Sequence, residues 1–197
     1  MLIIVLFGAP GAGKGTQAVL MANTHGLIHV STGDMLRQEI AAQTELGKLA
    51  EATIYKGELV PDELVVAMMR EQIEKYAGAK GFIFDGFPRT RAQAQALDQL
   101  MEEKRMSITA MLALDVPTEE LLNRLKKRGE ISGRTDDLFL DVIQNRINVY
   151  HQKTIPIIEY YRAQQKYHPI EGTGSIKEVS ERINERIREL YGCLPVK

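Results

Sequence analysis

The sequence predicts an α/β fold in which helices cover both faces of a mostly parallel sheet. Three observations support this prediction. Short apolar runs rich in β-branched residues alternate with longer segments of helical periodicity along the chain. A glycine-rich loop joins the first apolar run to the first helical segment, and 197 residues suit the core of a single domain. In such a fold, ligands gather at the carboxyl ends of the strands.

Three strands are expected in the N-terminal half. The first, 2–7, is a run of six apolar residues, which is typical of a strand buried on both faces. A short second strand is expected at 28–30, and the apolar segment 81–85 predicts a third. Pro88 has no N–H to donate to a strand ladder, so this strand is expected to end before it.

Helical segments are expected between these strands. The first follows the glycine-rich loop and continues to about His25. Ser31 and Asp34 have the S-x-x-D spacing of a helix N-terminus, in which the serine is the N-cap, and this predicts a helix from near Gly33. Glycine and proline then separate two more helical segments. These are expected near 44–56 and 62–76.

The C-terminal half continues the alternation. The apolar segment 110–114 predicts a fourth strand, and 167–170 predicts a fifth. The segment 175–191 predicts a final helix with one apolar face. The remaining expectations are helices at 91–104 and 118–128, a polar turn at 129–137, and one long helix over 138–164.

Composition and charge exclude several classes of protein. The net charge of −1, from 25 basic and 26 acidic residues, disfavours a nucleic-acid binder that depends on global positive charge. The apolar run 2–7 is far shorter than the roughly 20 residues of a membrane-spanning helix, and no basic segment precedes it as in a signal peptide. No membrane partner is therefore expected. A single cysteine, Cys193, cannot form an internal disulfide, which favours a reducing compartment and a cytoplasmic location.

The glycine-rich loop is a candidate phosphate site. Residues 8–14 match G-x-x-x-x-G-K between a strand and a helix, so that backbone N–H groups can surround a phosphate. A plain glycine turn is the alternative. Gly15 stands where a serine or threonine would hold Mg²⁺, so direct coordination by a hydroxyl is not expected. The residues expected to bind a nucleoside triphosphate here are Gly11, Ala12, Gly13, Lys14, Gly15 and Thr16.

Two strands end in an aspartate that could orient Mg²⁺ through water. Asp85 is favoured, because Arg89 follows shortly after it and supplies a second cation for phosphate. Asp115 precedes Pro117 and is expected to cap the next helix instead. Asp34 is ambiguous, since a metal-bound water and the helix N-terminus would explain it equally well.

Four sequence runs carry a resemblance to a known family. They are GAPGAGKGTQ (8–17), STGDMLR (31–37), FDGFPRT (84–90) and RGEISGRTDD (128–137). Their order and rough spacing resemble those of nucleoside monophosphate kinases, and the chain is similar to the short-lid adenylate kinases over nearly its whole length. The resemblance implies reversible transfer of a phosphoryl group from Mg·ATP to AMP, which gives two ADP. A monomer with no zinc is expected.

The resemblance also implies an architecture. It is a three-layer α/β/α P-loop domain with a five-stranded parallel sheet in the order 2-3-1-4-5. The expected parts are a core of 1–30, 62–128 and 138–197, a helical insertion for the nucleoside monophosphate at about 31–61, and a short lid at about 129–137.

The resemblance assigns phosphate contacts to five arginines. Arg37 and Arg89 would hold the acceptor phosphate, and Arg128, Arg134 and Arg146 the transferring group, with Arg134 and Arg146 also beside AMP. Arginine suits this role because it stays charged and pairs with phosphate through two donors. The alternative for each is a solvated helix face. The spacing from Arg134 to Arg146 is one residue longer than usual, so a bulge or a restarted helix is expected there.

The nucleobase contacts also follow from the resemblance. Thr32 and Gln93 match positions that contact the adenine of AMP, where pyrimidine kinases tend to carry alanine and asparagine. An N-terminal turn hydroxyl and an exposed helix glutamine are the alternatives. Leu36, Leu59, Val60 and Gly86 would line the AMP pocket, and a place in the core is the alternative for each of the first three. Arg124 would stack on the adenine of ATP, whose edge would face the backbone near Gly174.

Two other functions stay open at this point. A UMP/CMP kinase would share most of these motifs. A nucleotide-sensing P-loop module that binds without turnover would not need arginines around a second phosphate, and a GTPase would carry N-K-x-D, which is absent from the sequence.

Overall fold

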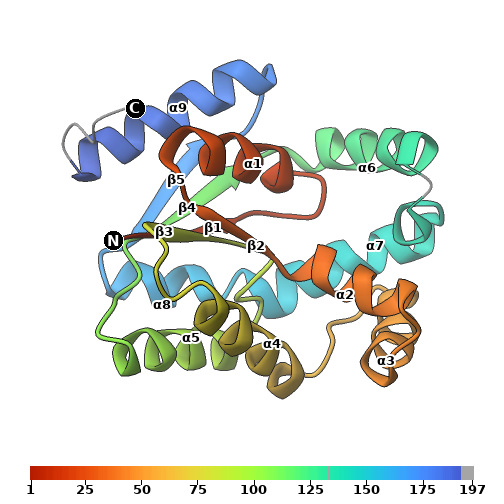
Figure 1. Ribbon diagram of the computed structural model, residues 1–197. Helices are drawn as coiled ribbons and strands as arrows, with labels where there is room; N and C mark the ends of the chain where they lie inside the picture. Colours follow the sequence, from red (N-terminus) through yellow and green to blue (C-terminus); the bar gives the residue numbers. More distant parts are fainter. Residues whose placement is uncertain (133, 192–197) are drawn as a thin grey trace.

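The computed structural model describes residues 1–132 and 134–191 (Figure 1). Gly133, within the expected lid, and Cys193 lie outside the described residues. The sheet contains β1 (Leu2–Phe7), β2 (Ile28–Ser31), β3 (Gly81–Asp85), β4 (Ala110–Asp115) and β5 (Tyr167–Glu171). Its order is β2-β3-β1-β4-β5, and each neighbouring pair is parallel. The predicted fold class and strand order are confirmed.

Helices cover both faces of the sheet, which makes three layers. Helices α1 (Lys14–His25) and α9 (Ile176–Tyr191) lie on one face, and α4 (Asp62–Lys75), α5 (Arg91–Glu103) and α8 (Ile157–Ala163) lie on the other (Figure 1). None of the helices in the described residues is long and apolar enough to cross a membrane.

The apolar run of β1 shows why this sheet needs both layers. Ile3, Val5 and Phe7 belong to the core cluster on the side of α4, α5 and α8. Leu2, Ile4 and Leu6 belong to the cluster on the side of α1 and α9. Since successive side chains of a strand point to opposite faces, a continuous apolar run buries both. The strand therefore places the loop that follows it at a rigid edge of the sheet.

Helices α2 (Thr32–Ala41) and α3 (Glu45–Ile54) form a small unit at the end of β2 (Figure 1). Ser31 caps α2 as predicted, because its hydroxyl accepts a hydrogen bond of 3.3 Å from the N–H of Asp34. The two helices touch through their backbones at Gly47, where a Cβ would lie 2.1 Å from the carbonyl oxygen of Glu39. These contacts hold the two helices together as one unit.

The expected C-terminal end of the helix at 118–128 was wrong. Helix α6 (Thr118–Ser132) continues beyond residue 128, and a 3₁₀ turn η1 (Thr135–Asp137) replaces the second half of the expected polar turn at 129–137. The hydroxyl of Ser132 donates to the carbonyl of Arg128 at 2.7 Å within the added turn. Gly129 lets η1 pack closely, since a Cβ there would lie 2.6 Å from the carbonyl oxygen of Asp137.

The single long helix expected over 138–164 is instead three segments. They are α7 (Leu140–Val149), a π-helical turn η2 (Tyr150–Thr154) and α8. Pro156, which lacks an N–H, interrupts the regular helical hydrogen bonds before α8, and within η2 the hydroxyl of Thr154 donates to the carbonyl of Arg89 at 2.9 Å. A new helix, α7, begins at Leu140 before Arg146, which is one of the two outcomes expected there.

Candidate active site

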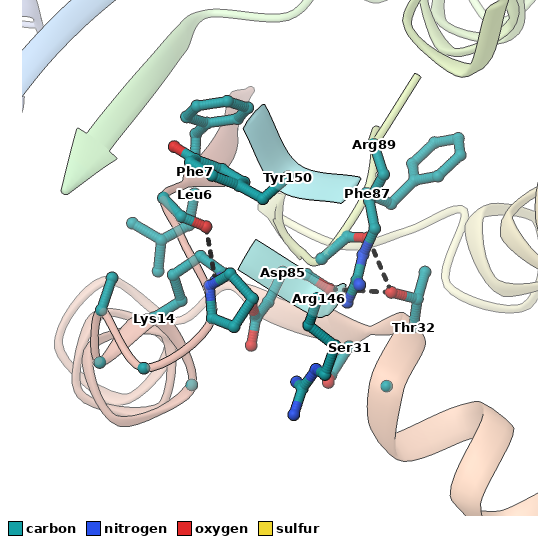
Figure 2. A pocket seen from close by; sticks show the side chains of 18 of the residues that line it. Leu6, Phe7, Lys14, Ser31, Thr32, Asp85, Phe87, Arg89, Arg146 and Tyr150 are labelled. Carbon is teal, nitrogen blue, oxygen red and sulfur yellow. Dashed lines mark hydrogen bonds between the residues drawn. The ribbon is translucent and has the colours of Figure 1, made fainter. Parts of the chain in front are cut away.

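The loop between β1 and α1 forms one wall of a pocket at the carboxyl end of the sheet (Figure 2). Gly13, the N-cap residue of α1, has φ 91°, which only glycine adopts freely. Gly11 has φ 86°, and a Cβ there would lie 2.9 Å from the carbonyl oxygen of Leu121. The loop thus packs against α6 and turns its backbone toward the pocket at a helix N-terminus, where anions bind.

Lys14 lies half-buried in this pocket. Its Nζ donates to the carbonyl oxygens of Gly8 at 2.8 Å and Ala9 at 3.0 Å. The pKa of Lys14 is lowered to about 8, mainly by desolvation and also by the charges of nearby arginines, against the opposing influence of Asp85. A bound phosphate would supply negative charge beside this ammonium group, so the charges here favour binding of an anion.

Asp85 lies at the end of β3, next to the loop, with 9% of its surface exposed. Burial alone would raise its pKa, but His29 at 3.5 Å and the charge of Lys14 lower the pKa below its usual value. The carboxylate is therefore ionised at neutral pH. A Cβ on Gly15 would lie 3.4 Å from Asp85 Oδ2, so the missing side chain at Gly15 leaves space beside this carboxylate.

The residue types around Asp85 fit a magnesium ion that is held mainly by substrate. Within residues 1–132 and 134–191, no group of three or more histidine, cysteine or acidic side chains could hold a metal by itself. Mg²⁺ commonly uses one or two carboxylates together with substrate phosphates and water. Asp85 supplies one such carboxylate.

The opposite wall of the pocket carries Arg89, Thr32 and Arg37. Arg89 Nε and Thr32 Oγ1 both donate to the carbonyl oxygen of Gly86, at 2.8 and 2.9 Å (Figure 2). Gly86 has φ 78°, and a Cβ there would lie 2.7 Å from Thr32 Oγ1. Burial and the charge of Arg146 lower the pKa of Arg89 from its usual value, which again favours a bound anion.

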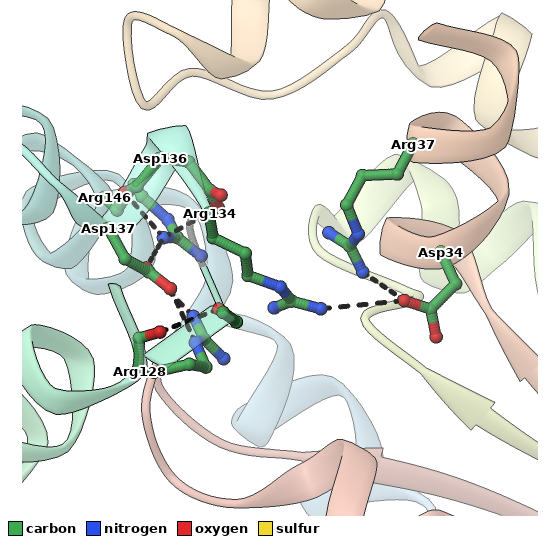
Figure 3. Close-up of polar contacts among 8 residues, drawn as sticks. Asp34, Arg37, Arg128, Arg134, Asp136, Asp137 and Arg146 are labelled. Carbon is green, nitrogen blue, oxygen red and sulfur yellow. Dashed lines mark hydrogen bonds and ion pairs between the residues drawn. The ribbon is translucent and has the colours of Figure 1, made fainter. Parts of the chain in front are cut away.

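Other arginines that line the same pocket are paired with carboxylates (Figure 3). Arg128 binds both carboxylate oxygens of Asp137, at 2.5 and 2.9 Å, and Arg146 contacts the same carboxylate. Arg146 also lies 2.8 Å from the carboxylate of Asp136. Burial would raise the pKa of Asp137, but the hydrogen bond from Arg128 and the charge of Arg146 lower it.

One carboxylate bridges the two sides of the pocket. Asp34 pairs with Arg37 on its own helix, and Arg134 reaches it from the other side, with its guanidinium 3.6 Å from Asp34 Oδ1 (Figure 3). Burial would raise the pKa of Asp34, yet hydrogen bonding from Arg37 and the charge of Arg134 lower it. Asp34 thus lies between two arginines that could also bind phosphate groups.

The predicted site residues converge on a single pocket of about 910 Å³, at the upper end of the usual range for ligand sites. It is lined by Gly11, Ala12, Gly13, Lys14, Gly15, Thr16, Thr32, Leu36, Arg37, Leu59, Val60, Asp85, Gly86, Arg89, Gln93, Arg124, Arg128, Arg134, Arg146 and Gly174. Arg124 donates to Glu120 at 2.8 Å and to the carbonyl of Gly172 at 3.2 Å. Asp115 does not line the pocket.

Sequence reasoning missed two carboxylates that pair with Arg128 and Arg146. Asp136 and Asp137 are buried, with 7% and 2% exposed, and each pairs with an arginine of the site. The sequence signal was present, since both follow Arg134 within the run RGEISGRTDD. Tyr150 was also missed. It lines the pocket from η2, and burial raises its pKa above the usual value.

Comparisons with known proteins agree with this geometry. A model of the family described as adenylate kinase matches residues 6–166. The chain is 49% identical to an adenylate kinase of Parabacteroides distasonis, and 47% and 46% identical to those of Flavobacterium psychrophilum and Bacteroides thetaiotaomicron. Each comparison covers 96% of this chain and the whole of the relative. The chain belongs to the adenylate kinase family, a family of phosphotransferases.

Proposed function

We propose that this protein catalyses the reversible, Mg²⁺-dependent transfer of the γ-phosphoryl group of ATP to AMP. The bond between the γ-phosphorus and the oxygen bridging to the β-phosphate breaks, a bond to a phosphate oxygen of AMP forms, and two ADP result. The observation that carries the proposal is one pocket with cations on two opposite walls, Lys14 on one and Arg37 with Arg89 on the other. A module that only senses one nucleotide has no use for the second wall.

On the donor side, the backbone of residues 8–13 and Lys14 bind the β- and γ-phosphates. Arg124 and the backbone near Gly174 border the space in which the adenine of ATP would lie. Asp85 would hold Mg²⁺ through water, and the ion would neutralise charge on the phosphates. Zinc has no role in this proposal.

On the acceptor side, Arg37 and Arg89 bind the phosphate of AMP. The second pKa of a phosphate monoester is about 6, so this phosphate is mostly dianionic at pH 7 and needs no side chain to remove a proton. Catalysis then depends on position and charge. Arg128, Arg134 and Arg146 lie where negative charge on the transferring group would be stabilised.

Leu36, Leu59, Val60 and Gly86 border the AMP side of the pocket, and Thr32 and Gln93 supply polar groups there. Both polar side chains are buried, with 3% and 2% exposed. A buried polar group left unpaired by the wrong base costs about 1–3 kcal/mol. AMP is therefore the proposed acceptor in preference to CMP or UMP.

The segment 31–61 is proposed to act as the AMP-binding insertion and the short segment about residues 129–137 as the lid. Adenylate kinases are an established example of lid closure. Closure would exclude water, which protects the phosphoryl group from hydrolysis and strengthens the arginine contacts. The protein is further proposed to act as a cytoplasmic monomer whose partners are ATP, AMP and ADP, with neither nucleic acid nor a membrane involved.

One experiment tests the proposed function. The protein is incubated with Mg²⁺, ATP and one of AMP, CMP, UMP or GMP, and nucleoside diphosphates are quantified by chromatography. We expect ADP to form with AMP at a far higher kcat/KM than any diphosphate forms with the other acceptors. Equal rates on all four acceptors would contradict the assignment to AMP, and faster reaction with CMP or UMP would favour a UMP/CMP kinase.

A further inference from the structure

The amide of Gln93 is held by two partners of opposite character. Gln93 lies in the first turn of α5, where its Oε1 accepts a hydrogen bond of 2.7 Å from the backbone N–H of Arg89. Its Nε2 donates to Asp62 Oδ1, also at 2.7 Å. Asp62 is the first residue of α4, so the contact joins two helices that lie side by side on the sheet. An N–H can only donate and an ionised carboxylate can only accept.

These partners fix which way the amide faces. If the amide rotated by 180°, Nε2 would meet the N–H of Arg89, and Oε1 would meet the carboxylate of Asp62. Both contacts would become repulsive, inside a pocket where Gln93 has 2% of its surface exposed. Such unpaired buried groups are costly.

Asp62 is itself held in place. Its second oxygen, Oδ2, accepts a hydrogen bond of 2.8 Å from the hydroxyl of Thr90. Thr90 is the N-cap of α5, and its hydroxyl oxygen accepts from the N–H of Gln93 at 3.1 Å. The carboxylate, the cap and the glutamine thus form one connected network. A connected network of this kind resists rotation of any one member.

The remaining capacity of Gln93 matches adenine. A glutamine amide offers two N–H donors and two acceptor positions, so one of each remains after the contacts with Asp62 and Arg89. Adenine presents its 6-amino donor beside a ring-nitrogen acceptor, which a glutamine amide can bind through both groups. Thr32 also offers an acceptor to a base. Its hydroxyl hydrogen is donated to the carbonyl of Gly86 at 2.9 Å, so its oxygen can then only accept.

We propose that Asp62 is a specificity-determining positioning residue, which locks the Gln93 amide in the orientation that accepts 6-aminopurines and rejects 6-oxopurines. A 6-oxopurine carries an acceptor where adenine carries the amino group, so only a rotated Gln93 could pair with it. The inference rests on the proposed function, because it assumes that AMP occupies the pocket beside Gln93.

The test compares AMP with inosine monophosphate, which differs from AMP by a 6-oxo group and a protonated ring nitrogen. For wild type and Asp62→Asn, kcat/KM is measured with Mg·ATP for both acceptors, and dissociation constants for both are measured by calorimetry without ATP. The asparagine amide of this variant can donate as well as accept, so it no longer opposes the rotated glutamine. Glu63→Gln is the matched control, since Glu63 is the other acidic residue in the first turn of α4.

We expect wild type and Glu63→Gln to prefer AMP strongly, and Asp62→Asn to reduce the preference for AMP over inosine monophosphate by about tenfold, the effect of one removed polar mismatch. A merely structural role would weaken both acceptors together and leave their ratio unchanged, which would overturn the inference. Equal use of both acceptors by wild type would also overturn it.

The calorimetric arm separates this inference from the proposed function. If wild type binds AMP without turning it over, the proposed function fails, and the ratio of dissociation constants still decides the role of Asp62. Circular dichroism shows whether Asp62→Asn folds. If it does not fold, Asp62→Ser, whose hydroxyl can also donate or accept, takes its place with the same two expected outcomes.

Discussion

The glycine-rich loop between β1 and α1, here called the phosphate loop, and the arginine cluster of Arg128, Arg134 and Arg146 line one pocket but are built differently. In the loop, backbone atoms hold the cation, since Lys14 donates to the carbonyl oxygens of Gly8 and Ala9. In the cluster, side chains hold side chains. The carboxylate of Asp137 alone contacts two of the three arginines.

This difference separates two ways of keeping positive charge in a pocket. Lys14 keeps a partly buried charge beside neutral carbonyl groups, and desolvation is the main cause of its lowered pKa of about 8. The arginines instead pair with carboxylates of the protein. If they bind nucleotide as proposed, the nucleotide would have to replace or share these partners, whereas the loop could bind phosphate without such an exchange.

The largest expected effect is that of Lys14→Met, which keeps the aliphatic stem and removes the charge at the β- and γ-phosphates. We expect kcat to fall by roughly a thousandfold or more, because several kcal/mol of transition-state stabilisation are lost at about 1.4 kcal/mol per tenfold. The thermal midpoint should not fall, since a desolvated charge is removed. Lys177→Met, at an exposed lysine of α9, is the control. A variant that keeps more than about a tenth of wild-type kcat would show that the donor site lies elsewhere.

Arg134→Ala is expected to have the next largest effect. Removal of one donor to developing charge typically lowers kcat by roughly a hundredfold or more. Because the arginine contact should tighten mainly in the closed, reacting state, KM for ATP should change far less than kcat. Steady-state kinetics measure both, with Arg188→Ala on α9 as the control. A rise in KM with kcat unchanged would mean that Arg134 merely holds ATP, and the proposed lid would then have to be abandoned.

A smaller effect is expected from pH. The free enzyme loses the charge of Lys14 as pH rises through about 8, so kcat/KM for Mg·ATP should fall roughly tenfold between pH 7 and pH 9. Bound phosphates favour the charged lysine, so kcat should fall less. The arginines stay charged over this range. A flat kcat/KM profile would contradict the difference drawn between the loop and the cluster.

Lys14 should also affect stability, with the opposite sign. Its pKa is lower in the folded chain than the usual 10.5, so between pH 8 and 10.5 the unfolded chain binds more protons. The contribution of Lys14 to the free energy of unfolding therefore rises with pH across this window. Denaturant titrations of wild type and Lys14→Met at pH 7.5 and 9.5 isolate this contribution. The gap between the two proteins should be smaller at the higher pH.

The smallest effect is expected from zinc chelation. The described residues hold no cluster of metal-ligating side chains, and the single cysteine of the sequence cannot build a cysteine-based zinc site. A zinc-selective chelator in the presence of sufficient Mg²⁺ should leave kcat and the thermal midpoint unchanged. Loss of activity on zinc chelation alone would contradict a metal-free lid.

The strands and the phosphate loop could be predicted because their signals are local. The apolar run of β1, the glycine spacing before Lys14 and the S-x-x-D cap at Ser31 each lie within a few residues, and the structure has all three. The strand order came from the resemblance, since pairing between distant strands leaves no local pattern.

The unpredicted features depend on residues that meet only in the folded chain. Gln93 and Asp62 are 31 positions apart and belong to different helices, so no spacing rule connects them. The extension of α6 depends in part on η1 packing against Gly129. Thr154 of the π-helical turn η2 donates to the carbonyl of Arg89, 65 positions earlier in the chain. The periodicity of apolar residues along the sequence does not predict such contacts.

The bridge from Arg37 through Asp34 to Arg134 has a consequence for how nucleotides arrive. Before a nucleotide binds, Arg37 and Arg134 already lie beside the carboxylate of Asp34, and the whole chain carries a net charge of −1. Their combined field is therefore weak beyond the Debye length of roughly 8 Å at physiological salt. These arginines therefore add little long-range attraction for nucleotides. The association rate of nucleotides should depend only modestly on ionic strength.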